Sequence, residues 1–183
     1  MTSPYVSVTQ VLKAHHFYDD LDKAGEANQI VGKERGSALH KAAHWLALGQ
    51  EPPWREPHPE LDRYLIGVRY FLRHHFVKLI MHEDEWINPF ERLVAHPDWH
   101  CEIDGVEAVI EIKTGALPRW VGLQLAGQLI ARGTYPPLKR FALSLPGDQS
   151  YKLVPQTDRH DFDEFRILLR AYHVRAKYME IGE

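Results

Sequence analysis

The sequence has a single cysteine, Cys101, among its 183 residues. One thiol excludes a disulfide framework and any zinc site built on several cysteines, and it fits a reducing compartment. No apolar run approaches the roughly 18 residues of a transmembrane helix, and no signal peptide or lipidation signal is present. We therefore expect a soluble, cytoplasmic protein without a membrane partner.

Charge of one sign is also scarce, because the formal net charge is only −3 at pH 7. A nucleic-acid partner would therefore be held by local groups rather than by the field of the whole molecule. The sequence contains no Gly-x-x-x-x-Gly-Lys-Ser/Thr phosphate loop, so it carries no ATP motor of its own. A Gly-x-Ser-x-Gly motif is missing too, so an ester or peptide hydrolase of that type is not indicated.

The sequence has enough apolar residues, 44% of the total, for one sizeable core. We expect a single domain over residues 1–183, with a helical part over about 1–80, a sheet core over about 81–157 and a C-terminal helix over about 160–180. The expected helices cover residues 7–16, 33–49, 61–80, 118–132 and 161–179. The expected strands cover 81–86, 90–95, 108–114, 141–145 and 151–154, the last two antiparallel. Strands flanked by helices in this order predict an α+β fold, or α/β with a mixed sheet.

The region around Glu111 brings acidic and basic residues into one pattern. Asp98 is followed by an Asp104-Gly105 turn and then by an apolar run that ends in Glu111-Ile112-Lys113. Residues at i and i+2 of a strand point to one face, so Glu111 and Lys113 project together. A hairpin through the turn returns Asp98 to their side. Two carboxylates at one sheet edge suit Mg²⁺ or Mn²⁺.

The order Asp98, hairpin, Glu111-x-Lys113 resembles the PD-(D/E)XK nuclease superfamily. Three further elements resemble its RecB-like or phage-type exonuclease branch: the Gly36-x-x-x-His40 spacing, the helix with Gln124, and the opening residues 6–12. The resemblance implies a restriction-endonuclease-like core, with a central mixed sheet flanked by helices.

The implied function is a Mg²⁺- or Mn²⁺-dependent deoxyribonuclease, an exonuclease or endonuclease acting in recombination, repair or phage DNA processing. Its partners would be DNA, as linear ends or single strands, and a second copy of the chain or a recombination protein. Its location would be the cytoplasm of a bacterial or phage-infected host cell. Two alternatives stay open: a catalytically idle nuclease fold that serves as a DNA-binding or assembly subunit, and a general interaction module in which the Glu-x-Lys pattern is coincidental.

The resemblance also assigns roles to residues. Asp98 and Glu111 would hold the metal with the main-chain carbonyl of Ile112. Lys113 would orient or activate water, or neutralise the phosphate; burial would lower its pKa and the nearby acids would raise it. His40 would be a further metal ligand that shifts preference toward Mn²⁺. Gln124 would reach the metal site or a DNA phosphate.

A further metal-ligating acid is expected upstream of Asp98. Glu83 has the spacing typical of the family, and Glu85 and Glu91 are the alternatives. Two positions depart from the family pattern: Gln128 stands where an aromatic residue is common, and His96 stands where a glycine commonly precedes Pro-Asp. Four residues near the site could contact bases or phosphates, although Trp120 suits the core equally well: Arg119, Trp120, Lys139 and Arg140.

Overall fold

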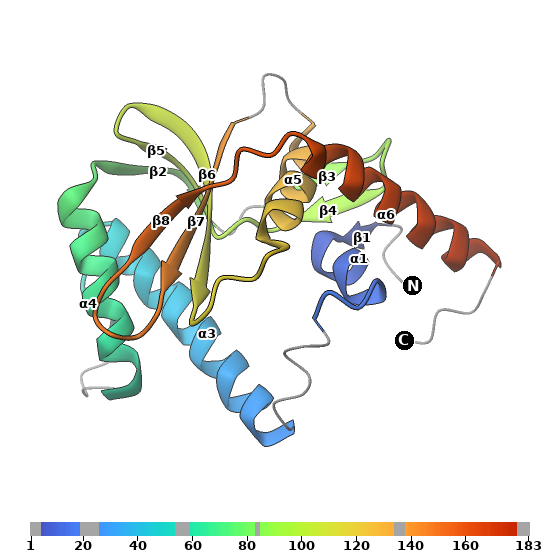
Figure 1. The fold of residues 1–183 in the computed structure, drawn as a ribbon. Helices are drawn as coiled ribbons and strands as arrows, with labels where there is room; N and C mark the ends of the chain where they lie inside the picture. Colours follow the sequence, from blue (N-terminus) through green and yellow to red (C-terminus); the bar gives the residue numbers. More distant parts are fainter. Residues whose placement is uncertain (1–4, 19–25, 54–58, 83–84, 134–137, 179–183) are drawn as a thin grey trace.

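The structure is a computed structural model that describes residues 5–18, 26–53, 59–82, 85–133 and 138–178 (Figure 1). Its larger sheet has the order β2-β5-β6-β7-β8. These strands are β2 (Val77–His82), β5 (Trp99–Ile103), β6 (Val106–Thr114), β7 (Lys139–Leu145) and β8 (Lys152–Pro155). Only β6 and β7 pair in parallel, so the sheet is mixed. The predicted α+β class with a central mixed sheet is confirmed.

Helices cover both faces of this sheet (Figure 1). Helices α3 (Glu26–Ala47) and α4 (Pro59–His74) pack on one face, where Leu39 and Leu65 join Ile110 in a buried cluster. Helices α5 (Val121–Arg132) and α6 (His160–Tyr178) lie on the other, where Leu125 and Phe165 join Val109. Strand β6 is apolar on both sides at this point because helices bury both faces.

A second, smaller sheet contains the N-terminal strand and lies against helix α5. It has the order β1-β4-β3, with β1 (Val6–Ser7), β4 (Leu93–Ala95) and β3 (Trp86–Asn88). Helix α1 (Val8–Ala14) follows β1 and begins with a capping box, in which Ser7 and Gln10 each bond the other's backbone N–H. Of the helices in the described part of the chain, none is both long and apolar enough to cross a membrane.

The structure corrects the predicted end of the helix over 61–80. Helix α4 ends at His74, and Val77–His82 form the edge strand β2, antiparallel to β5. The sheet therefore begins before residue 81, where the helical part was expected to give way to it. The apolar residues after His74 fit either period, and pairing with β5 selects the strand. Helix α3 also begins earlier than predicted, at Glu26.

Candidate active site

The site is built on the hairpin of β5 and β6. Asp104 and Gly105 connect the strands with φ angles of 50° and 81°, and Ile103 pairs with Val106 across them. Two positive φ angles in a two-residue connection are those of a type I′ turn, whose twist matches the strands. Because Trp99 pairs with Ile110, Asp98 stands just before β5 and beside Glu111 of β6. The predicted hairpin is confirmed.

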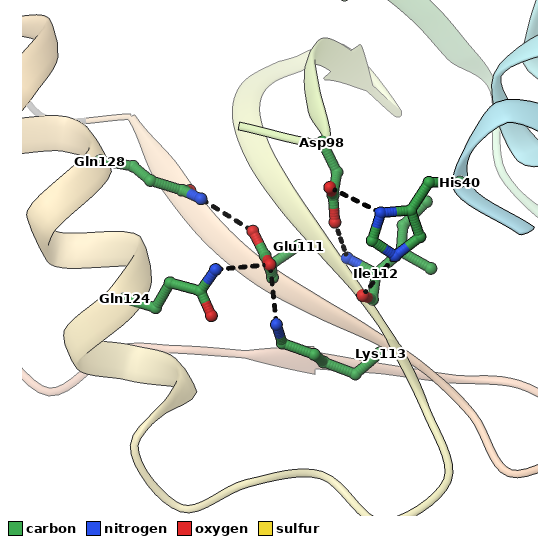
Figure 2. Close-up of polar contacts among 7 residues, drawn as sticks. All are labelled: His40, Asp98, Glu111, Ile112, Lys113, Gln124 and Gln128. Atoms are coloured by element: carbon green, nitrogen blue, oxygen red, sulfur yellow. Dashed lines mark hydrogen bonds and ion pairs between the residues drawn. The ribbon is translucent and has the colours of Figure 1, made fainter. Parts of the chain in front are cut away.

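Asp98 is anchored to β6 by a backbone hydrogen bond. The N–H of Ile112 donates to Asp98 Oδ2 over 2.7 Å. The other carboxylate oxygen, Oδ1, lies 3.1 Å from Nδ1 of His40 on α3. The second ring nitrogen of His40, Nε2, is 3.2 Å from the carbonyl oxygen of Ile112. The imidazole therefore bridges two of the expected metal ligands, Asp98 and the Ile112 carbonyl (Figure 2).

Glu111 is buried, with 4% of its surface exposed, and three side chains donate to it. Lys113 Nζ and Gln124 Nε2 lie 2.8 and 2.6 Å from Oε1, and Gln128 Nε2 lies 2.8 Å from Oε2 (Figure 2). Lys113 lies two residues along the same strand, on the same face, as predicted. The structure thus brings Glu111, Lys113 and Gln124 together. We call these residues, with Asp98, His40 and Gln128, the carboxylate cluster.

Gln128 is a member of the cluster that sequence reasoning missed. It is 2% exposed and lies one helical turn after Gln124 on α5, so both amides meet the same carboxylate. The signal was its spacing of four residues from Gln124, which places both side chains on one helix face. It replaces the aromatic residue expected at this position with a second amide donor to Glu111.

The electrostatics of the two carboxylates differ. Burial alone would raise the pKa of Asp98, but the charge and hydrogen bond of His40, the Lys113 charge and the Ile112 N–H hold it below its usual range. Burial and the Asp98 charge raise the pKa of Glu111. Lys113 and Gln128 act in the opposite direction, and their effect on this pKa is smaller. Two acids in one buried site cannot both ionise at their usual pKa, and here the environment favours charge on Asp98.

The two cationic groups respond to these acids. Burial would lower the pKa of Lys113, but the charges of Glu111 and Asp98 outweigh it and raise that pKa. The nearby acids therefore change the pKa of Lys113 more than burial does. For His40 burial likewise opposes the proton, yet Asp98 raises its pKa to about 9. A protonated imidazole has two N–H donors, which matches its two oxygen contacts.

The donor types of the cluster suit a hard divalent cation. Two carboxylates and a main-chain carbonyl are oxygen ligands of the kind that Mg²⁺ and Mn²⁺ prefer. The buried Oε1 atoms of Gln124 and Gln128 have no hydrogen-bond partner among the described residues. Within those same ranges, no three His, Cys, Asp or Glu side chains are grouped closely enough to hold a metal. The residues therefore fit a metal by chemistry, and their mutual hydrogen bonds must rearrange before they can bind one.

The upstream acids are not part of the cluster as described. Glu83 lies outside the described residues. Glu85 is half-exposed and lies 3.8 Å from His96, and Glu91 lies 3.7 Å from Arg166 of α6. Each of these two carboxylates thus lies beside a basic side chain that is not part of the cluster.

The basic and aromatic candidates near the site lie in three different surroundings. Trp120 packs on Tyr18, with ring centroids 4.5 Å apart, and Lys113 Nζ lies 5.7 Å from its ring, so it borders the cluster. Arg140 is buried and bonds Asp161 and the carbonyl of Gly122, so it ties α5 to α6 and is not a free DNA contact. Lys139 and Arg119 are exposed.

Neither a protein-family model nor a curated protein matches this chain significantly. Solved structures are similar to it, and two of them match over 98% of this chain and 96% of the other. The crystal structure of LHK-Exo in complex with dAMP has a TM-score of 0.43 and 16% sequence identity. The crystal structure of an alkaline exonuclease (LHK-Exo) from Laribacter hongkongensis has a TM-score of 0.33 and 15% identity.

Proposed function

We propose that this protein is a divalent-metal-dependent DNA nuclease of the PD-(D/E)XK superfamily, of the RecB-like type, and that it acts as an exonuclease. The observation that supports this most directly is the meeting of Asp98, Glu111 and Lys113 at one hairpin. The Ile112 N–H donates to Asp98, and the Lys113 ammonium and the Gln124 amide donate to Glu111. Apolar residues often replace buried ion pairs without loss of stability, so stability alone does not account for this group of acids, a cation and amides, and a chemical role does.

The cluster would hold Mg²⁺ or Mn²⁺ through its oxygens. Asp98, Glu111 and the Ile112 carbonyl are the proposed ligands, His40 is the proposed nitrogen ligand, and Glu83 is the proposed additional acid. When bound, such a metal lowers the pKa of water and stabilises charge on the phosphoryl oxygens.

The remaining residues of the cluster would orient the reacting groups. The Lys113 ammonium lies 2.8 Å from Glu111 Oε1 and stays protonated because the acids raise its pKa. It is placed to offset phosphate charge or to position the attacking water. Gln124 and Gln128 hold the Glu111 carboxylate in one orientation from the facing helix. The substrate would be linear DNA or a single strand, in recombination, repair or phage DNA processing.

The experiment is incubation of the purified protein with end-labelled linear DNA and with closed circular DNA, in Mg²⁺, Mn²⁺ or EDTA. An exonuclease degrades the linear DNA only, and only with metal. Cleavage of the circle as well would replace the exonuclease with an endonuclease. DNA binding without cleavage under any metal condition would favour the alternative function, an idle nuclease fold that serves as a binding or assembly subunit.

A further inference from the structure

A cavity lies beside the cluster, at the same end of the sheet. Its volume is about 410 Å³, and its lining residues are Gly115, Ala116, Leu117, Ser144, Pro146, Lys152 and Val154. Gly115 has a φ of 76° and donates its N–H to the Leu145 carbonyl over 2.9 Å. This left-handed residue turns the chain away from β6, so that residues 116 and 117 form one wall and strands β7 and β8 form the other.

The strand register connects this cavity to the cluster. Lys113 of β6 pairs with Ser144 of β7, and Ser144 pairs with Lys152 of β8. Directly paired residues project to the same face, so these three side chains form one row on the α5 face of the sheet. Neighbouring strands are about 4.8 Å apart, which places the Lys152 Cα roughly 10 Å from that of Lys113.

The lining has the chemistry of a nucleotide site. Ala116, Leu117, Pro146 and Val154 supply apolar surface, and Ser144 supplies a buried hydroxyl. Lys152 is the only charged residue among the described residues that line the cavity. Apolar walls accept the face of a base or a sugar, and one cation matches one phosphate. The volume is within the range of small-ligand sites, which is roughly 300–1,000 Å³.

We propose that this cavity binds one nucleotide of the DNA strand that enters the active site, with Lys152 on its phosphate. This inference rests on the proposed nuclease function, because that function sets the path of the DNA. The DNA strand would run along the row of side chains from Lys113 to Lys152. Strand continuity then places the scissile phosphate at Lys113 and a neighbouring nucleotide in the cavity. The cavity would contribute to substrate binding, and its lining includes none of the proposed metal ligands.

The test measures binding of a fluorescein-labelled oligothymidylate of about twelve nucleotides to the full chain in EDTA, over a range of salt concentrations. Lys152→Gln removes the cation, and Ala116→Phe fills the cavity. Lys78→Gln is the matched control, because Lys78 is an exposed lysine on β2, at the other edge of the same sheet. The degradation rate of end-labelled linear DNA with Mn²⁺ is measured for all four proteins.

For Lys152→Gln we expect affinity to fall roughly two- to fivefold, the size of a partly exposed ionic contact. The slope of log affinity against log salt should decrease by about 0.7, the value for one phosphate of a single strand. Ala116→Phe should weaken binding without that change in slope, and Lys78→Gln should match the wild type.

The two proposals fail in different ways. If the wild type degrades DNA, while Lys152→Gln and Ala116→Phe bind and degrade it as the wild type does, the nucleotide site is overturned and the nuclease stands. If the wild type binds the oligothymidylate with the predicted dependence on Lys152 but degrades nothing, the nuclease is overturned and the nucleotide site stands. If the wild type neither binds nor degrades DNA, both are overturned.

Discussion

At the scale of single residues, substitution of Lys113 should affect the proposed catalysis without affecting metal binding. Its ammonium touches Glu111, yet ammonium groups are not metal ligands, and the carboxylates remain when it is removed. Glu111 belongs to both functions, because it is the common partner of the lysine and of two glutamines. Substitutions at the two positions should therefore have different signatures.

Lys113→Met keeps most of the apolar stem and removes the charge. We expect divalent metal to bind still, while DNA degradation falls roughly 10²–10⁴-fold, the range for a lost proton-transfer or charge-stabilising group. Calorimetric Mn²⁺ titration and a linear-DNA assay measure the two properties. In Glu111→Gln, the comparison variant, both metal affinity and degradation should be lost. Degradation by Lys113→Met at the wild-type rate would remove the Glu-x-Lys pattern from the mechanism.

His40→Ala tests the proposed nitrogen ligand. Imidazole contributes to Mn²⁺ sites and matters little to Mg²⁺, so the variant should lose more affinity for Mn²⁺ than for Mg²⁺. Titration of both metals in the wild type and in the variant gives the ratio directly. Equal losses for the two ions would mean that His40 acts only through its contacts with Asp98 and the Ile112 carbonyl.

At the scale of elements, the position of Gln124 and Gln128 depends on how closely α5 packs against α6. Gly127 lies between them in the sequence and faces Phe165 of α6. A Cβ at Gly127 would lie 2.6 Å from Phe165 Cζ, which is far inside van der Waals contact. The glycine therefore sets the helix spacing, and through it the depth at which α5 presents its amides to Glu111.

Gly127→Ala should destabilise the protein by roughly 1–2 kcal/mol, because overpacking outweighs the gain in helix propensity. Gly36→Ala is the contrasting variant on α3. A Cβ there meets nothing within 4 Å in the part of the chain that the structure describes, so the change should stabilise by about 0.5–1 kcal/mol. Urea denaturation of both variants gives these free energies of unfolding. A stabilised Gly127→Ala protein would show that α6 gives way easily.

At the scale of the whole molecule, the buried Cys101 thiol connects stability to alkaline pH. Burial raises its pKa from an ordinary 9.0 to about 12. Between these values the unfolded chain releases the proton and the folded chain keeps it, so the unfolded state is favoured as pH rises. The contribution of Cys101 to stability is therefore complete below pH 9 and is lost toward pH 12.

The measurement compares the free energy of unfolding of the wild type with that of Cys101→Ala from pH 8 upward. Above pH 9, the wild type should lose stability relative to the variant by about 1.4 kcal/mol per pH unit, since one proton is involved. Below pH 9 the difference between the two proteins should be constant. Parallel pH profiles over the whole range would contradict the burial-shifted pKa.

The sequence by itself determined the features that arise from neighbouring residues. Side chains alternate between the two faces of a strand, which puts Glu111 and Lys113 on one face. The Asp104-Gly105 pair favours a tight turn through its own residue types. The hairpin and the place of Asp98 could therefore be predicted. The fold class followed from the order of helical and strand periods. The end of α4 could not be predicted, because the residues from Val77 to Ile80 become a strand only by pairing with β5.

Only the tertiary structure decided the contacts between distant segments. His40 meets Asp98 and Ile112 because α3 docks on the opposite side of β6 from α5, and Gln128 meets Glu111 because α5 packs on the sheet. The raised pKa of Lys113 depends on the balance between burial and two acids, which spacing along the chain does not contain. The alignment of Lys113 with Lys152 likewise follows from strand order and register. Such contacts are set by the packing of the whole chain, so local sequence patterns cannot specify them.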